Sequence, residues 1–486
     1  MNKAVKLNLV TGRMLRYLRS WGQEDGSFNG FHTHPVWRLH PGILEDHYSG
    51  YAAWGAPYLI GLAELVRRSD SKSYLEYAVK LCEYALTHQQ EDSKWDFCGA
   101  EFGRAFNRST ICNMLQNLSL CRLVSTIPDK LDSAFKDRIC QAVLRNLESY
   151  NVTLDSIESK GHAFVVTANQ DCAAAWAIFE WMEAFGHDER WMEIASALLD
   201  KRLQNTLVMG VPDATSAAML REAGQPDYIE PAEYYGVIIP PFWQAYRKTG
   251  KKEYLEACRS LANHVVRSSW LDSEGLRRVH RCYDRVDGQW QASREPMLVA
   301  GMGLLALSFH EMRTQSGFEF IDVFLTEMNQ TYAAHQHPYG FLTPATGWHD
   351  EYDILCGTTW QVHDFAYLMH VAPDVEQVLK ESHENGPDLA VLLGYNDAWV
   401  ESDDEWAWLP PASYGFGIAA AKKDRYGYPC LPKFCDPPYP ARHLNPPVRL
   451  RLVDGVFHIE APDYASIAVR SIYRRPYVLN GKHYSH

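Results

Sequence analysis

The fold is indicated by a helix that opens with the sequence TANQDCAAAWA, residues 167–177. Three polar residues, Asn169, Gln170 and Asp171, stand at its start, and small or aromatic residues follow. Small side chains let neighbouring helices approach closely, so this composition is typical of the inside of a crowded helical assembly. Buried polar groups are costly unless they are hydrogen-bonded, so the three polar residues are either a capping cluster or part of a site.

Helical periodicity continues from the start of the chain to about residue 372 and predicts twelve helices. We expect them near residues 3–20, 44–68, 72–88, 109–125, 130–150, 168–185, 188–204, 231–249, 252–269, 295–312, 318–335 and 351–371. Short turns alternate with six long loops. The even-numbered helices follow the long loops and begin about 60 residues apart, which is the sign of a repeat. The repeats barely resemble one another in sequence, so the repetition is one of architecture.

Six helical hairpins of this kind can close into a double ring. We therefore predict an all-α (α/α)6 toroid over residues 1–372, which forms the catalytic domain and has the even-numbered helices inside. Residues 373–486 are expected to be a Pro-rich connection and a small β segment packed on the toroid. Residues 448–459 alternate in polarity around the turn Asp454-Gly455, and Ser466–Arg470 is expected to continue the same sheet.

Composition excludes several classes of function. The 486 residues carry a formal net charge of -13, so a global nucleic-acid-binding surface is not expected. The first residues hold no apolar stretch of a secretory signal, and nowhere do about 18 apolar residues follow one another, so we expect a cytoplasmic chain without a membrane span.

The cysteines are scattered singly without zinc spacing. His32 and His34 alternate but lack a third ligand, and we expect no metal and no cofactor.

In a helical toroid the long loops and the starts of the inner helices share one face, where helix dipoles favour negative charge. Residues of catalytic types at these positions define the candidate active site. The candidate catalytic residues are His162, Asn169, Tyr234, Tyr283, Arg294, Asp46 and Glu233. The candidate substrate-binding residues are Trp37, His47, Arg104, Trp348 and His349. Dipole compensation in a first helical turn is the alternative role for Asp46, and Asp364, about three turns into the last helix, is expected to be structural.

The fifth long loop is rich in arginine. Arg277, Arg278, Arg281, Arg285 and Arg294 stand out on an acidic chain. Arginine binds carboxylates with two parallel hydrogen bonds, so the loop is suited to an acidic sugar. Acidic residues in the same loop leave surface ion pairs as the alternative.

The twelve-helix pattern resembles the (α/α)6 toroids of polysaccharide lyases, unsaturated glucuronyl hydrolases and related glycosidases. In the glucuronyl hydrolases an inner helix opens with paired aspartates, to which Glu45-Asp46 is only a loose analogue. The toroid lyases use an amide, arginine or acid to neutralise a uronate carboxylate, and tyrosine or histidine as base and acid. The resemblance thus implies that amide, arginine, tyrosine and histidine side chains carry the reaction, and side chains of these types occur at the predicted starts of the inner helices.

Three functions follow as hypotheses. The first is β-elimination on a uronate-containing oligosaccharide or polysaccharide, in which Arg294 and Asn169 neutralise the carboxylate, His162 or Tyr234 takes the proton and Tyr283 donates one to the leaving oxygen. The second is a glycoside hydrolase that uses the two carboxylates of Asp46 and Glu233. The third is a non-catalytic protein that binds a partner on its helical repeats. Isomerase or epimerase chemistry remains a further alternative.

Overall fold

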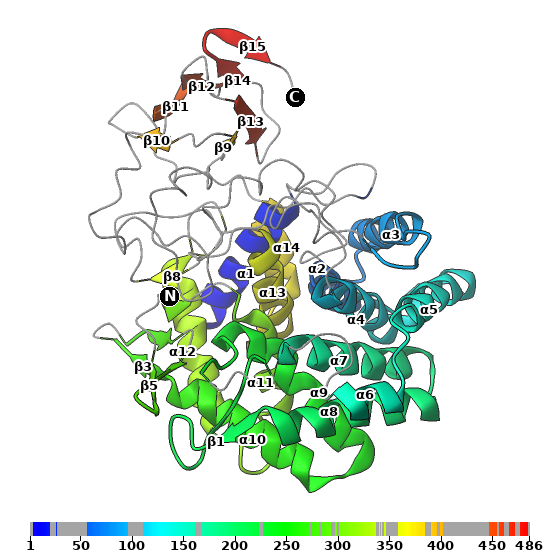
Figure 1. Cartoon of the computed structure of the whole chain (residues 1–486). Coiled ribbons are helices and arrows are strands. Elements are labelled where there is room, and N and C mark those ends of the chain that lie inside the picture. The colour runs from blue at the N-terminus through cyan, green and yellow to red at the C-terminus, as the bar shows by residue number, and fades with distance from the viewer. Residues whose placement is uncertain are drawn as a thin grey trace.

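The structure is a computed structural model of the 486-residue chain (Figure 1). It describes residues 3–19, 26, 56–95, 110–160, 167–222, 227–272, 275–280, 283–292, 297–298, 301–336, 340, 342, 345–346, 358–383, 390–395, 399–401, 447–453, 456–460, 466–471 and 477–484. All of the statements below concern these residues. None of the helices among them is long and apolar enough to cross a lipid bilayer.

Six helices form a closed inner ring. They are α2 (Tyr58–Ser69), α4 (Thr110–Thr126), α7 (Ala168–Phe185), α9 (Tyr235–Thr249), α11 (Gly303–Met312) and α13 (Thr358–Val371). Each of them packs against the next, and α13 packs against α2, so the ring has no open side. The inner helices supply much of one continuous apolar core. The predicted (α/α)6 arrangement is confirmed.

Glycine marks three of the crossings within this ring. A Cβ atom at Gly61 of α2 would overlap the ring of Phe365 in α13, and one at Gly236 of α9 would overlap the backbone of Leu305 in α11. A Cβ atom at Gly303 of α11 would overlap the carbonyl group of His363 in α13. The helices approach so closely that a methyl group has no room at these points. The small residues of the inner helices are therefore a requirement of the ring.

The outer helices surround the ring. They are α1 (Lys3–Arg19), α3 (Lys72–Thr87), α5 (Ser133–Glu148), α8 (Glu189–Asn205), α10 (Lys252–Arg267) and α12 (Phe320–His335). Aspartate side chains cap two of them, because Asp132 accepts a hydrogen bond from the N–H of Phe135 (2.7 Å) and Asp188 accepts one from Trp191 (3.0 Å). All twelve predicted helices thus have counterparts in the structure.

Several details differ from the prediction. The eighth helix begins with the 3-10 turn η6 (Ala232–Tyr234), and the tenth begins at residue 303 instead of 295. A second 3-10 turn, η5 (Pro128–Lys130), connects α4 to α5. Two helices were not predicted: α6 (Leu154–Lys160) lies in a long loop, and α14 (Val375–His383) follows the ring and packs against α1.

The long loops contain short strands that the sequence did not indicate. Strand β1 (Leu207–Met209) pairs with β2 (Ala217–Met219), and β5 (Tyr283–Val286) pairs with β6 (Gln289–Ala292). A four-stranded sheet has the order β3 (Ser269–Leu271), β4 (Arg277–Val279), β7 (Met297–Leu298) and β8 (Ala345–Thr346), so it joins the fifth and sixth long loops.

The C-terminal part contains two sheets. The strands are β9 (Ala390–Tyr395), β10 (Trp399–Glu401), β11 (Pro447–Val453), β12 (Val456–Glu460), β13 (Ser466–Ser471), β14 (Tyr477–Leu479) and β15 (Lys482–Tyr484). The pair Val453 and Val456 closes the β11–β12 hairpin, as predicted. Strand β13 pairs with β9 and lies outside the five-stranded sheet β10-β11-β12-β14-β15. The prediction that residues 466–470 continue the hairpin sheet is therefore wrong, because the alternating pattern fixes a strand but not its partner.

A residue with left-handed backbone follows each of the six outer helices. These residues are Gly26, Ser93, Asn151, Gly210, Gly275 and Gly340. Around several of them the chain turns onto the next outer helix; for example, the carbonyl group of Ser93 accepts a hydrogen bond from Asn146 of α5 (2.9 Å). The last of these turns closes the outer layer, because Gln336 donates to the carbonyl group of Val10 in α1 (2.7 Å). We call these six positions the loop-start turns.

Candidate active site

The starts of two neighbouring inner helices, α7 and α9, are tied together by the chain between them. The N–H group of Ala168 donates to the carbonyl group of Arg221 (2.9 Å), and that of Glu230 donates to Met219 (2.7 Å). The N–H group of Asn169 donates to the Glu230 carboxyl oxygen Oε1 (3.0 Å). Residues about 60 positions apart in the sequence therefore meet at the end of the ring where the inner helices begin.

Glu230 is the most unusual residue of this region. Its side chain is fully buried, and its second oxygen, Oε2, has no hydrogen-bond partner in the described part of the chain. Burial raises the pKa of the carboxyl group to about 7, although the Arg221 charge and the Asn169 N–H group oppose the shift. A carboxyl group that titrates near neutrality is suited to general acid–base catalysis.

Asp364 shows how such a buried acid behaves when its role is structural. It lies in α13 and caps the start of α11, where it accepts hydrogen bonds from the N–H group of Gly301 (2.8 Å) and from the Tyr332 hydroxyl (2.9 Å). Burial raises its pKa to about 8. Both of its oxygens are thus bonded, whereas one oxygen of Glu230 is left over. The structural role predicted for Asp364 agrees with these contacts.

Three predicted catalytic residues lie around Glu230. Asn169 is buried, and its side-chain oxygen Oδ1 has no hydrogen-bond partner within the described ranges. Glu233 and Tyr234 lie in η6, at the entry to α9, and are also buried. The negative charge of Glu233 contributes to the raised pKa of Glu230, so the two carboxyl groups are close enough to interact. The structure therefore brings Asn169 and Glu233 close to Glu230, and Tyr234 follows Glu233 in η6.

Asp171, on the same helical turn as Asn169, is occupied by an ion pair. Its oxygen Oδ2 lies 2.8 Å from Nη2 and 3.0 Å from Nε of Arg202, and both side chains are almost completely buried. Arg202 belongs to the outer helix α8 and also donates to the carbonyl group of Thr167 (3.4 Å). This pair holds the start of α7 against the outer layer, so the role of Asp171 is structural.

Tyr283 lies on the β5–β6 hairpin at the border of this region. Its hydroxyl group bonds to Ser268, its ring lies 5.5 Å from that of His264, and burial raises its pKa. These contacts are with the C-terminal end of the outer helix α10. The hairpin borders the site through the pairing of Tyr228 with Asp284, but no contact within the described residues joins Tyr283 to Glu230.

The remaining predicted residues lie outside the described residues. They are His162, Arg294, Asp46, Trp37, His47, Arg104, Trp348 and His349. The histidine pair considered for a metal, His32 and His34, lies outside them as well. Where the structure describes the chain, no cluster of three His, Cys, Asp or Glu side chains is arranged to hold a metal ion.

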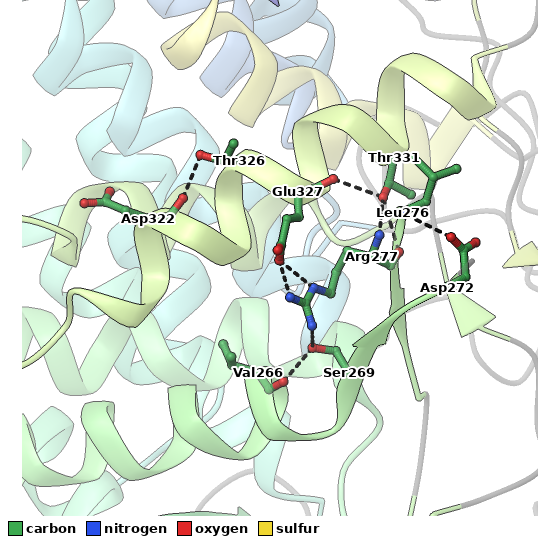
Figure 2. A network of polar contacts seen from close by, with 9 residues as sticks. All are labelled: Val266, Ser269, Asp272, Leu276, Arg277, Asp322, Thr326, Glu327 and Thr331. Carbon is green, nitrogen blue, oxygen red and sulfur yellow. Dashed lines mark hydrogen bonds and ion pairs between the residues drawn. The ribbon is translucent and has the colours of Figure 1, made fainter. Parts of the chain in front are cut away.

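Two arginines of the fifth long loop form ion pairs with the protein itself. Arg277 donates through Nε to Glu327 of α12 (2.9 Å), and its N–H group donates to the Thr331 hydroxyl (2.9 Å), as Figure 2 shows. Arg278 lies 2.7 Å from the Asp272 carboxylate. The ion-pair alternative is confirmed for these two residues. They fix a loop-start turn to the next outer helix and are not available to a substrate.

No known protein family matches the sequence, and a search of curated proteins finds no match. Solved structures do match. An inactive variant of an α-1,6-mannanase from Salegentibacter sp. HEL1_6, in complex with α-1,6-mannotetrose, has a TM-score of 0.54 and 14% identity over 76% of this chain and 99% of that chain. A sugar epimerase from a ruminal bacterium has a TM-score of 0.55 and 14% identity over 76% and 98%. Cellobiose 2-epimerase from Bacillus thermoamylovorans B4167 has a TM-score of 0.50 and 10% identity over 73% and 95%.

These likenesses show the fold of this chain, which is the (α/α)6 toroid. At 10 to 15% identity they carry no assignment of residues or substrate to this chain. One of the three proteins is named as a mannanase and two as epimerases, so the same architecture occurs with different sugar chemistry.

Proposed function

We propose that this chain is a carbohydrate-active enzyme in which Glu230 transfers a proton to or from a sugar. The observation that carries the proposal is the buried Glu230 carboxyl group, which has one oxygen without a protein partner. It lies at the end of the toroid where the long loops and the inner-helix starts converge. The similar structures that process mannan, cellobiose and other sugars are consistent with this class of substrate.

The surrounding residues have distinct roles in this proposal. Because burial raises the pKa of Glu230 to about 7, its carboxyl group can donate a proton to a glycosidic oxygen and take one back near neutral pH. Glu233 supplies the second carboxyl group that hydrolysis of a glycosidic bond requires. The Asn169 oxygen Oδ1 can accept a hydrogen bond from a sugar hydroxyl, which would satisfy a buried polar atom.

Hydrolysis is favoured over β-elimination because the site offers a pair of carboxyl groups. A lyase must bind the carboxylate of a uronic acid, which Glu230 and Glu233 disfavour when they are ionised, although Arg221 and Arg202 act on Glu230 in the opposite direction. In the arginine-rich loop, Arg277 and Arg278 are paired with Glu327 and Asp272, whereas Arg294, which the sequence analysis assigns to this carboxylate, lies outside the described residues. The first proposal is therefore a glycoside hydrolase acting on a neutral sugar through Glu230 and Glu233.

β-Elimination on a uronate remains the second candidate because Asn169 and Tyr234 stand at the starts of the neighbouring inner helices α7 and α9. An amide is the group that toroid lyases use to neutralise a carboxylate, and a tyrosine can serve as the base. In this reaction Asn169 would bind the uronate and Tyr234 would abstract the proton. The two reactions give different products, since only elimination leaves a C4–C5 double bond.

The experiment compares the purified chain with two variants on a panel of neutral and uronate-containing oligosaccharides. New reducing ends and ultraviolet absorbance are followed together. We expect new reducing ends without new absorbance, a loss of about 10²–10⁴-fold in kcat for Glu230→Gln, and no change for the exposed control Glu193→Gln. New absorbance would establish the lyase instead. Binding without turnover of any oligosaccharide would leave the non-catalytic hypothesis standing and overturn both enzymes.

A further inference from the structure

A cavity of about 590 Å³ opens at the other end of the ring, where the inner helices α11 and α13 finish. Its polar lining includes Arg68, His310, Arg313, Asp322, Asn329 and His370. These residues come from α2, α11, α12 and α13 and the residue that follows α11. The candidate active site lies at the starts of inner helices and this cavity at their ends, so the two are separate.

The charge of the lining is positive on an acidic protein. Two arginines face one aspartate, although the chain as a whole has a formal net charge of -13. Arg68 donates to the carbonyl groups of Met369 and Ala372 (2.6 Å each) and lies 3.9 Å from the Glu64 carboxylate, so it forms part of the wall and its charge is compensated. Arg313 contacts His310, and within the described ranges its guanidinium is not paired with a carboxylate. An arginine in this state is suited to bind an anion.

The other polar groups add hydrogen-bonding capacity without adding charge. His310 has its pKa lowered to about 4 by burial and by the nearby Arg313 and His370, so its ring is neutral at pH 7. The pKa of His370 is also lowered, and its Nδ1 atom bonds to the carbonyl group of Ala366 (2.7 Å). Asn329 accepts a hydrogen bond from the Tyr367 hydroxyl through Oδ1 (2.9 Å), which leaves its NH₂ group as a donor.

We propose that this cavity binds a small hydrophilic anion, a phosphate or carboxylate group on a body the size of a sugar, and that Arg313 contacts the anionic group. The volume lies in the range of sites that bind small molecules. Arginine, neutral imidazole and amide donors together are suited to anionic oxygen atoms. Leu325 and Val371 line the rest of the cavity and can cover the apolar face of the body.

Two substitutions test the site by changing its charge. Arg313→Gln removes the charge. Asn329→Asp keeps the oxygen that accepts from Tyr367 and adds a negative charge to the lining. The matched control is Arg190→Gln on α8, because Arg190 is exposed and its guanidinium lies over the ring of Trp191 outside the cavity. Unchanged circular dichroism and melting temperature identify the variants that are folded.

Calorimetric titration of the full chain with inorganic phosphate, mannose 6-phosphate, glucuronate and neutral mannose is the measurement. We expect one of the anions to bind with a Kd below about 10 mM, and the affinity to fall tenfold or more in Arg313→Gln and Asn329→Asp but not in Arg190→Gln. A preference for mannose 6-phosphate identifies a phosphate ester, and a preference for glucuronate identifies a carboxylate. Equal affinity in Arg313→Gln and the control, or no binding of any anion to the wild-type chain, would overturn the proposal.

Discussion

The Glu230 carboxyl group should make the protein less stable as the pH rises, and Glu230→Gln tests this directly. Glutamine has nearly the same volume and can still accept the hydrogen bond from Asn169, but it cannot ionise. The pKa of Glu230 is raised from 4.5 to about 7 in the folded chain. One pKa unit corresponds to about 1.4 kcal/mol, so the ionised carboxyl group costs about 3 kcal/mol in the folded state relative to the unfolded one.

The direction of the effect follows from the raised pKa. Below about pH 4.5 the carboxyl group is protonated in both states, and the cost is absent. Above about pH 7 it is ionised in both states, and the cost is complete. The wild-type chain should therefore lose this contribution between these two pH values. Glu230→Gln should not lose it, so the variant is expected to be the more stable protein at pH 8.

Melting temperature is a practical measure of this difference. With about 2 cal/mol/K of unfolding entropy per residue, 486 residues give about 1 kcal/mol/K, so about 3 kcal/mol corresponds to about 3 °C. We expect Glu230→Gln to melt about 3 °C above the wild type at pH 8 and at the same temperature at pH 5, with Glu193→Gln following the wild type at both. A variant that melts lower at pH 8 would show that Glu230 is an ordinary ionised helix cap, and the acid–base role would lose its basis.

Three further substitutions probe how the ring is held together. Gly303→Ala places a methyl group against the His363 carbonyl group, and it should destabilise the protein by about 3 kcal/mol in denaturant unfolding. Arg202→Met leaves the buried Asp171 carboxylate without its partner and should cost about 3–5 kcal/mol; pairing it with Asp171→Asn should recover most of this loss. Glu327→Gln weakens the ion pair that holds the fifth loop and should cost about 1 kcal/mol, with faster hydrogen exchange in residues 275–280 as the local sign. Hydrogen exchange in residues 275–280 that is as slow in the variant as in the wild type would show that the ion pair does not fix the loop.

The ring could be predicted from sequence because its cause is local. Each segment shows helical periodicity in its own sequence, and small residues such as Gly303 stand where two helices cross closely. The helix α14 was missed because nine residues after Pro373 are too few for a clear period, and its contact with α1 is tertiary. The β3-β4-β7-β8 sheet was missed for a related reason, since it joins short segments from two loops.

One signal in the sequence was overlooked. Gln23-Glu24-Asp25-Gly26 and Gln90-Glu91-Asp92-Ser93 are nearly the same, and Gly26 and Ser93 both have left-handed backbone after an outer helix. The expectation that the repeats barely resemble one another therefore does not hold for these two segments. The other loop-start turns conserve the backbone and not the sequence, because glycine and asparagine tolerate the same conformation.

Part of the candidate site could be predicted from the sequence, but its central residue could not. Asn169 and Glu233 were found because polar residues at the starts of inner helices converge in a toroid. Glu230 was not singled out because nothing in the local sequence distinguishes it from the other acids of the fourth long loop. Its burial depends on contacts with Met219 and Asn169, which belong to segments earlier in the chain, and no local pattern reports that convergence.

The inner helices all run in the same direction, so the two ends of the ring differ electrostatically. Every inner helix begins after a long loop and ends at a short turn, so the partial positive charges of their starts lie at one end and the partial negative charges at the other. Glu230 and Glu233 lie at the starts, where the helix dipoles offset part of the cost of burying a carboxylate. Arg122 and Arg313 lie towards the ends, where a cation is favoured. Arg122 bonds there to Glu180 and Glu311 on two other inner helices (2.8 and 3.0 Å), so the acids at that end are neutralised. The same polarity of the ring thus supports proton transfer at one face and anion binding at the other.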